Sequence, residues 1–163
     1  MASSSALDKF DLALLKALQQ DNTIPLRELA SLVHLSTASV QRRIQRMQGD
    51  GVIKANTAVI DPMKVGKVIT LLVEVHVERA QAQDLEVMKK QFSGSEIQQC
   101  YYVTGEADFV LVLTVADMEE FQFLAKRLFY NNANVKWFRT IVVMDKVKTT
   151  LDVPFAGIEQ DAP

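Results

Sequence analysis

The first stretch of sequence able to do chemistry is basic and rich in amides, and it lies in the first third of the chain. Residues 36–54 carry four basic side chains and a single acid, although the whole chain has 18 Lys and Arg against 20 Asp and Glu. Guanidinium groups bind phosphate and guanine, and side-chain amides can pair with the edge of adenine. The stretch is therefore a candidate site for a polyanion, with a merely solvated helix face as the alternative interpretation.

A second candidate site is the predicted turn Thr104-Gly105-Glu106-Ala107-Asp108. A glycine lets a ligand approach the backbone closely, and the N–H groups of a turn can hold a carboxylate. The two acidic side chains could accept hydrogen bonds from an ammonium group. The turn thus offers partners for both charged groups of a free amino acid, with a plain hairpin turn and solvated acids as the alternative.

The sequence offers little for catalysis or metal binding. Its histidines are His34 and His76, and Cys100 is its single cysteine. A metal cage needs several Cys or His ligands, and with two histidines in all a histidine-based triad would be hard to build. We therefore expect no enzyme, no metal site and no cofactor. His34 is expected in a turn, His76 facing solvent or a subunit contact, and Cys100 packed as a small thiol.

Hydropathy and the N-terminal residues favour a cytoplasmic protein. No run approaches the ~18 consecutive apolar residues that a membrane span needs, so we expect no membrane partner. Met1-Ala2-Ser3-Ser4-Ser5-Ala6 has neither the basic nor the apolar region of a signal peptide. With DNA as the polyanion, the expected location is cytoplasmic and nucleoid-associated.

Apolar residues at helical spacing predict three helices that position the basic stretch, over residues 8–20, 25–33 and 36–48. Gly49-Asp50-Gly51 is a strong helix stop after the third. Two short strands within residues 52–60 are then expected to form a hairpin, or wing. The first segment is therefore predicted to be a three-helix unit followed by a wing.

The third of these helices has two chemically different sides. Its apolar residues share the side expected to face the core, whereas the opposite side holds Ala38, Arg42 and Gln45. A short turn followed by such a helix describes a helix-turn-helix, whose second helix enters the major groove of DNA; a bundle with a solvated third helix is the alternative. The predicted DNA contacts, including a wing lysine for phosphate, are Ser36, Thr37, Ala38, Ser39, Gln41, Arg42, Arg43, Gln45, Arg46 and Lys54.

The rest of the chain alternates between strand and helix patterns, which gives an α+β fold class. The predicted order is strand 69–78, helix 82–92, strand 97–104, strand 109–115, helix 118–128 and strand 135–148. This β-α-β-β-α-β order is that of the ferredoxin-like fold. The predicted organisation is a winged helix-turn-helix domain, a linker, a ferredoxin-like domain and a C-terminal tail, at residues 1–60, 61–68, 69–153 and 154–163.

Short motifs in both segments resemble those of one family, in the same order along the chain. They are Leu7-Asp8, Leu29-Ala30, Leu35-Ser36, Arg43-Ile44, Gly51-Val52-Ile53, Val103 to Asp108, and Val142-Val143-Met144. With these motifs the chain resembles the Lrp/AsnC (feast/famine) transcription regulators over about residues 7–150. It departs from their pattern at Thr37, where a proline is common, and at Met47-Gln48, where Leu-Glu is usual.

The resemblance implies a winged helix-turn-helix, a hinge strand and a ferredoxin-like domain for effector binding and assembly. Members of the family form dimers that often assemble into octamers, and many bind amino acids at the loop matching the Gly-acid-x-Asp turn, between dimers. Leucine or methionine is the favoured effector. The effector-binding residues implied here are Tyr102, Val103, Thr104, Gly105, Glu106, Ala107 and Asp108.

The hypothesis that unites these features is a sequence-specific DNA-binding transcription regulator that responds to a free amino acid. Its expected partners are double-stranded DNA, the amino acid, and further copies of the chain as a homodimer that assembles to an octamer. Two alternatives stay open: an architectural DNA-binding protein without an effector, and a ferredoxin-like small-molecule-binding subunit or enzyme.

Overall fold

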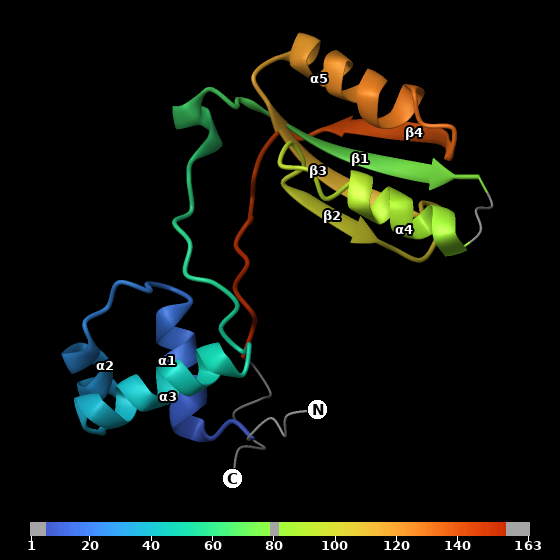
Figure 1. The fold of residues 1–163 in the computed structure, drawn as a ribbon. Coiled ribbons are helices and arrows are strands. Elements are labelled where there is room, and N and C mark those ends of the chain that lie inside the picture. The colour runs from blue at the N-terminus through green and yellow to red at the C-terminus, as the bar shows by residue number, and fades with distance from the viewer. Residues whose placement is uncertain (1–5, 79–81, 156–163) are drawn as a thin grey trace. The chain divides into compact units, whose positions relative to one another are not determined.

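The chain folds into two units, which the computed structural model describes over residues 6–78 and 82–155 (Figure 1). The first unit comprises Met1–Ala58 together with Thr149–Pro163, and the second comprises Val59–Lys148. In the first unit the side-chain amide of Gln19 donates to the carbonyl of Val153 and accepts from its N–H, both at 3.1 Å. Val153, just before the predicted tail, therefore contacts the helical unit.

Three helices build the first unit, as predicted. Helix α1 spans Lys9–Leu18, α2 spans Leu26–Val33 and α3 spans Thr37–Gly49. Between α2 and α3, His34 adopts the left-handed conformation with φ +53°, and so lies in the turn where it was expected. One apolar stripe from each helix meets in a common core, whose buried residues are Leu14, Leu29, Ala30, Val33, Val40 and Met47.

The predicted hairpin wing does not form, because residues 50–61 contain no strand. The N–H groups of Val52 and Ile53 both donate to the carbonyl of Met47, at 2.9 and 3.1 Å, which folds the chain back against the end of α3. Beyond them the apolar side chains find nothing to pack on, and Val59 is 97% exposed. An isolated two-stranded hairpin is marginal at best, so Lys54 lies exposed on irregular backbone instead of on a wing.

The second unit is the predicted β-α-β-β-α-β arrangement. Its sheet has the order β2-β3-β1-β4 with every neighbouring pair antiparallel. A short 3-10 turn within the predicted linker precedes it, at Pro62–Val65. The elements are β1 (Ile69–Val77), α4 (Ala82–Gln91), β2 (Gln99–Tyr102), β3 (Phe109–Val115), α5 (Met118–Ala125) and β4 (Val135–Val142).

Two strands are shorter than expected, since the predicted spans 97–104 and 135–148 pair only over β2 and β4. In addition, α5 continues into a π-helical turn at Lys126–Tyr130. The elements themselves match the prediction, and the differences lie at their ends, where hydrogen bonding to a neighbouring strand sets the boundary.

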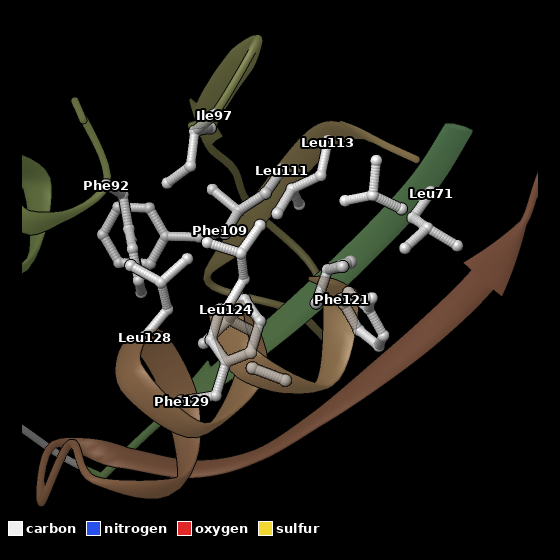
Figure 2. Close-up of a cluster of buried hydrophobic side chains, with 14 of the residues drawn as sticks. Leu71, Phe92, Ile97, Phe109, Leu111, Leu113, Phe121, Leu124, Leu128 and Phe129 are labelled. Atoms are coloured by element: carbon white, nitrogen blue, oxygen red, sulfur yellow. The ribbon is translucent and has the colours of Figure 1, made fainter. Parts of the chain in front are cut away.

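Helices α4 and α5 cover one face of the sheet, and the core lies between (Figure 2). Alternate residues of β3 are fully buried there, and the ring of Phe109 meets that of Phe92, just after α4, edge-on, with centroids 5.2 Å apart. Cys100 packs against this core as predicted, and burial raises the pKa of its thiol. Within the described residues the other face of the sheet carries no helix.

His76 on that open face is 8% exposed, so it does not face solvent, whereas the alternative prediction of a subunit contact stays a prediction. Trp137 lies directly across from it on β4, and the two rings stack with centroids 3.5 Å apart. The indole thus shields the imidazole within a single chain. The alternation of residues along β1 correctly predicted the face of the sheet on which His76 lies. Its exposure depends on Trp137, the residue opposite it on β4.

Candidate DNA interface and effector loop

Helix α3 turns one side to the core and the other to solvent. Val40 and Met47 are fully buried, whereas the opposite side is exposed at the positions where the sequence predicted it: Ala38, Gln41, Arg42 and Gln45. Ser36 caps the helix, since its hydroxyl accepts from the N–H of Ser39 at 3.2 Å. Small residues at the start of the helix and amides and a guanidinium further along can lie close to base edges.

Two arginines predicted to contact DNA have partners inside the unit. Arg43 Nη1 lies 2.7 Å from Asp11 Oδ1 and 2.8 Å from Asp8 Oδ2. Arg46 Nη2 pairs with the second carboxylate oxygen of Asp11. Both guanidiniums therefore point toward α1, and they are set apart from the exposed side that holds Arg42.

The centre of this cluster is Asp11, whose side chain is fully buried. Its Oδ2 also accepts from the N–H of Asp8 at 3.2 Å, while Asp8 Oδ1 accepts from the N–H of Asp11 at 2.9 Å, which closes a capping box at the start of α1. A buried carboxylate is tolerated when it is paired and fully hydrogen-bonded. The cluster thus joins the start of α1 to the middle of α3.

The charges in this cluster perturb one another. Burial works to raise the pKa of the Asp8 carboxyl, but hydrogen bonds from backbone N–H groups and from the Arg43 guanidinium outweigh it, and the pKa is lowered. The pKa of Arg43 is raised, chiefly by its hydrogen bond to Asp11. Both shifts favour the charged forms, as expected for groups that stabilise the fold as ions.

The sequence analysis did not identify Asp8 and Asp11 as partners of the arginines. A signal was present in the spacing: Asp8 and Asp11 are three residues apart at the start of α1, and Arg43 and Arg46 are three residues apart on α3. Residues three apart share one side of a helix. The spacing could not show which sides of the two helices face each other, since that depends on how the core packs.

The second candidate site is a turn between β2 and β3 whose ends are tied to the sheet. The N–H of Val103 donates to the carbonyl of Asp108 at 2.9 Å, and the N–H of Asp108 donates to that of Val75 at 3.0 Å. The Asp108 carboxylate accepts from the N–H of Val77 at 2.9 Å. Gly105 at the tip has φ +118°, a conformation that favours glycine. The turn therefore has a fixed base and a tip shaped by its glycine.

The side chains of this turn differ in accessibility. Thr104, Gly105 and Glu106 are exposed, whereas Val103 and Ala107 are half-buried. Tyr102, at the end of β2, is 55% exposed, and the Nζ of Lys89 on α4 lies 5.4 Å from the centre of its ring. The structure thus groups the predicted effector residues at one end of the sheet, with a carboxylate, a glycine backbone and an aromatic ring.

The described residues give no sign of a metal centre or of a membrane span. They contain no group of three or more His, Cys, Asp or Glu placed to hold a metal ion. None of the helices in residues 6–78 and 82–155 is both long and apolar enough to cross a bilayer.

Both units match families of known proteins. The AsnC-type helix-turn-helix domain matches residues 7–48, and the Lrp/AsnC ligand binding domain matches residues 70–153. An HTH-type transcriptional regulator of Sinorhizobium fredii is 43% identical over 149 residues, which cover 91% of this chain and 88% of that protein. The chain belongs to the Lrp/AsnC family.

Solved structures of similar proteins agree with this assignment. An AsnC family transcriptional regulator from Agrobacterium tumefaciens has a TM-score of 0.86 at 29% identity, over 92% of this chain and 98% of that one. A Neisseria meningitidis transcriptional regulator in complex with L-Met has the same fold, with a TM-score of 0.86 at 23% identity over 94% and 99% of the two chains. As an Lrp/AsnC member, the chain is a DNA-binding transcription regulator, which confirms the predicted family and fold class.

The ion pairs of this Lrp/AsnC helix-turn-helix generate a pH-dependent stability. Asn caps a helix about as well as Asp, so Asp8→Asn removes the charge and keeps the cap. Because folding lowers the pKa of Asp8, its charge stabilises the fold at neutral pH. This contribution begins to fall as the pH drops below about 3.8, the ordinary value, and is lost as the pH falls through the lowered pKa of the folded protein. We expect the substitution to lower the free energy of unfolding by about 0.5–1 kcal/mol at pH 7 and by less at pH 3.

Urea unfolding followed by circular dichroism at both pH values measures this difference. Asp152→Asn is the control, because Asp152 is an exposed acid that belongs to the same unit. An equal loss at both pH values would show that the amide weakens the cap and that the charge of Asp8 contributes nothing.

Proposed function

We propose that α3 reads duplex DNA from the major groove with its exposed side. The observation that carries this proposal is the composition of that side, where Ala38, Gln41, Arg42 and Gln45 lie exposed and the first acid is Asp50, after the helix ends. Gln can pair with adenine and Arg with guanine or phosphate, and a small residue permits close approach.

The residues flanking this side complete the proposed DNA interface. Ser36, Thr37 and Ser39 lie at the start of α3, where hydroxyls and free N–H groups suit phosphate. Lys54 is exposed a few residues beyond the helix and is a further phosphate contact. Arg43 and Arg46 are not included in this interface, because their guanidiniums pair with Asp11.

We propose further that the regulator responds to a free amino acid bound at the turn between β2 and β3. The exposed backbone of Thr104 and Gly105 suits the carboxylate, and Glu106 and Asp108 suit the ammonium group. Tyr102, Val103 and Ala107 would contact the side chain. The L-Met complex of the Neisseria meningitidis regulator supports an amino acid as effector, and leucine or methionine remains favoured.

The proposed assembly is a homodimer in which a second copy covers the open face of the sheet. That face presents apolar side chains without a helix over them, among them Tyr101, Trp137 and Ile141 at 49%, 46% and 39% exposed. A sheet is stable when both faces are either covered or polar. Two chains would supply the two reading helices that bind half-sites, and the family resemblance extends this to an octamer acting on nucleoid DNA in the cytoplasm.

The DNA interface is tested by removing the charge of Arg42. The probe is a duplex selected from a random pool by the protein itself. We expect Arg42→Gln to weaken binding by about 1–3 kcal/mol, and a phosphate contact to reduce the salt slope by about 0.9. Fluorescence anisotropy over a KCl series measures both quantities. Lys126→Gln in the second unit is the control, and unchanged binding by Arg42→Gln would refute the assignment of α3 as the reading helix.

The effector site is tested at Asp108. Asparagine keeps an oxygen that can accept from the N–H of Val77, so Asp108→Asn removes charge while leaving the turn tied to β1. A thermal-shift screen of the twenty amino acids first identifies the ligand, since binding raises the melting temperature. We then expect calorimetry to show at least about tenfold weaker binding, the cost of one charged hydrogen bond, with DNA binding retained. Glu119→Gln is the exposed control, and undiminished affinity would overturn the site.

The dimer is tested at Val112, a half-buried residue of β3 that pairs with Leu72 on the open face. Val112→Lys puts a charge in the centre of the proposed interface, where its burial would be costly. We expect sedimentation to show a smaller assembly than for the unaltered protein. Phe123→Lys, at a 69% exposed position on α5, is the control. An unchanged mass for Val112→Lys would place the interface elsewhere.

A further inference from the structure

The buried carboxylate behind α3 has a consequence for DNA affinity. We propose that Asp11 limits the sequence-independent part of DNA binding, because it holds Arg43 and Arg46 toward α1 and so withholds two guanidiniums from DNA phosphate. This inference rests on the proposed role of α3 as the reading helix. Asp11 itself touches no DNA in this proposal, and it acts by deciding which of the arginines of α3 the DNA can reach.

The geometry divides the arginines of α3 into two kinds. Each oxygen of Asp11 takes one guanidinium, Oδ1 that of Arg43 at 2.7 Å and Oδ2 that of Arg46. Arg43 is held further by Asp8 at 2.8 Å. Within the described residues Arg42 forms no ion pair, and it is exposed. The side of α3 that faces solvent therefore presents the charge of Arg42 among neutral amides and small residues.

A guanidinium held in this way is not available to DNA without a penalty. The side chain of Asp11 is 0% exposed, and those of Arg43 and Arg46 are 23% and 35% exposed. If either arginine turned to a phosphate, the buried carboxylate would lose a partner, which costs far more than a surface ion pair returns. The rotation is therefore unfavourable even beside the strong field of a duplex.

Fewer reachable cations weaken the sequence-independent part of binding. Each phosphate that a protein neutralises adds the same free energy on every sequence, and it steepens the salt dependence by about 0.9 in log K against log salt. Base contacts from the amides and Arg42 differ between sequences. By removing two phosphate-seeking charges from the interface, Asp11 lowers the affinity for specific and random DNA alike and makes the salt dependence shallower, while the ratio between the two affinities is left to the base contacts.

The first experiment compares Arg46→Gln with Arg42→Gln on the self-selected duplex and on a scrambled duplex, over a KCl series. Arg46→Gln leaves Asp11 paired with Arg43, so the fold is retained. We expect its salt slope to match that of the unaltered protein, whereas that of Arg42→Gln is smaller by about 0.9. An equal reduction by both substitutions overturns the inference. No effect of Arg42→Gln on affinity or slope instead refutes the proposed reading helix, so the two failures are distinguishable.

The second experiment releases the arginines with Asp11→Asn, after circular dichroism has shown that the variant is folded. We expect tighter binding to both duplexes, a slope steeper by up to about 1.8, and an unchanged ratio of specific to random affinity. Asp50→Asn removes the same charge from the exposed end of α3 and is the matched control. If Asp11→Asn changes the slope no more than Asp50→Asn does, the inference is wrong.

A double substitution separates the release of arginines from the loss of an acid. Adding Arg46→Gln to Asp11→Asn removes one of the two released guanidiniums, and the additional slope should fall by about 0.9. An additional slope that is not reduced by this second change overturns the inference. Should Asp11→Asn fail to fold, the salt slopes of Arg46→Gln and Arg43→Gln test the inference instead, because each of these variants leaves Asp11 paired with one arginine.

Discussion

A carboxylate buried away from water has to be surrounded by donors, and this requirement organises the helical unit. Asp11 meets it with a backbone N–H from its own capping box and with guanidiniums from α3. The same contacts fix how α3 is rotated on α1, which determines the side chains that remain exposed. The packing of Val40 and Met47 in the apolar core requires the same rotation of α3, so the ion pairs and the core favour one orientation.

The sheet unit follows a different constraint, because a four-stranded sheet has two faces and its helices cover one. On the covered face every second residue of β3 is fully buried, in a core that includes the aromatic rings of Phe92, Phe121 and Phe129. On the open face Trp137 covers His76, and Arg139 pairs with Glu74 across the same two strands. These contacts shield the polar groups of that face within one chain, while its apolar residues are left for another layer to cover.

The features predictable from sequence were those with a local cause. Helical and alternating periods predicted the helices α1 to α5 and the strands β1 to β4, and the order of strands and helices predicted the ferredoxin-like sheet. What failed depended on partners distant in sequence: Val59 has no neighbour on which a wing could pack, His76 is buried by a residue of β4, and Arg43 turns toward α1. The exposed side of α3 was predictable because an apolar stripe that faces the core places the residues of the opposite side in solvent.

Both candidate sites contain an acid that sequence reasoning can misassign. Asp108 fits an ammonium ligand by type, yet one of its oxygens already accepts from the backbone of β1. Asp11 was marked in the sequence only by its spacing from Asp8, yet its carboxylate pairs with the arginines beside it. In each case the carboxylate makes a hydrogen bond or ion pair within the fold. The groups that remain exposed beside it are the ones proposed to bind a ligand: the tip around Gly105 at the turn, and the side around Arg42 on α3. At both proposed sites, recognition would therefore depend on groups that internal hydrogen bonds leave exposed, so the buried acids and their exposed neighbours have to be considered together.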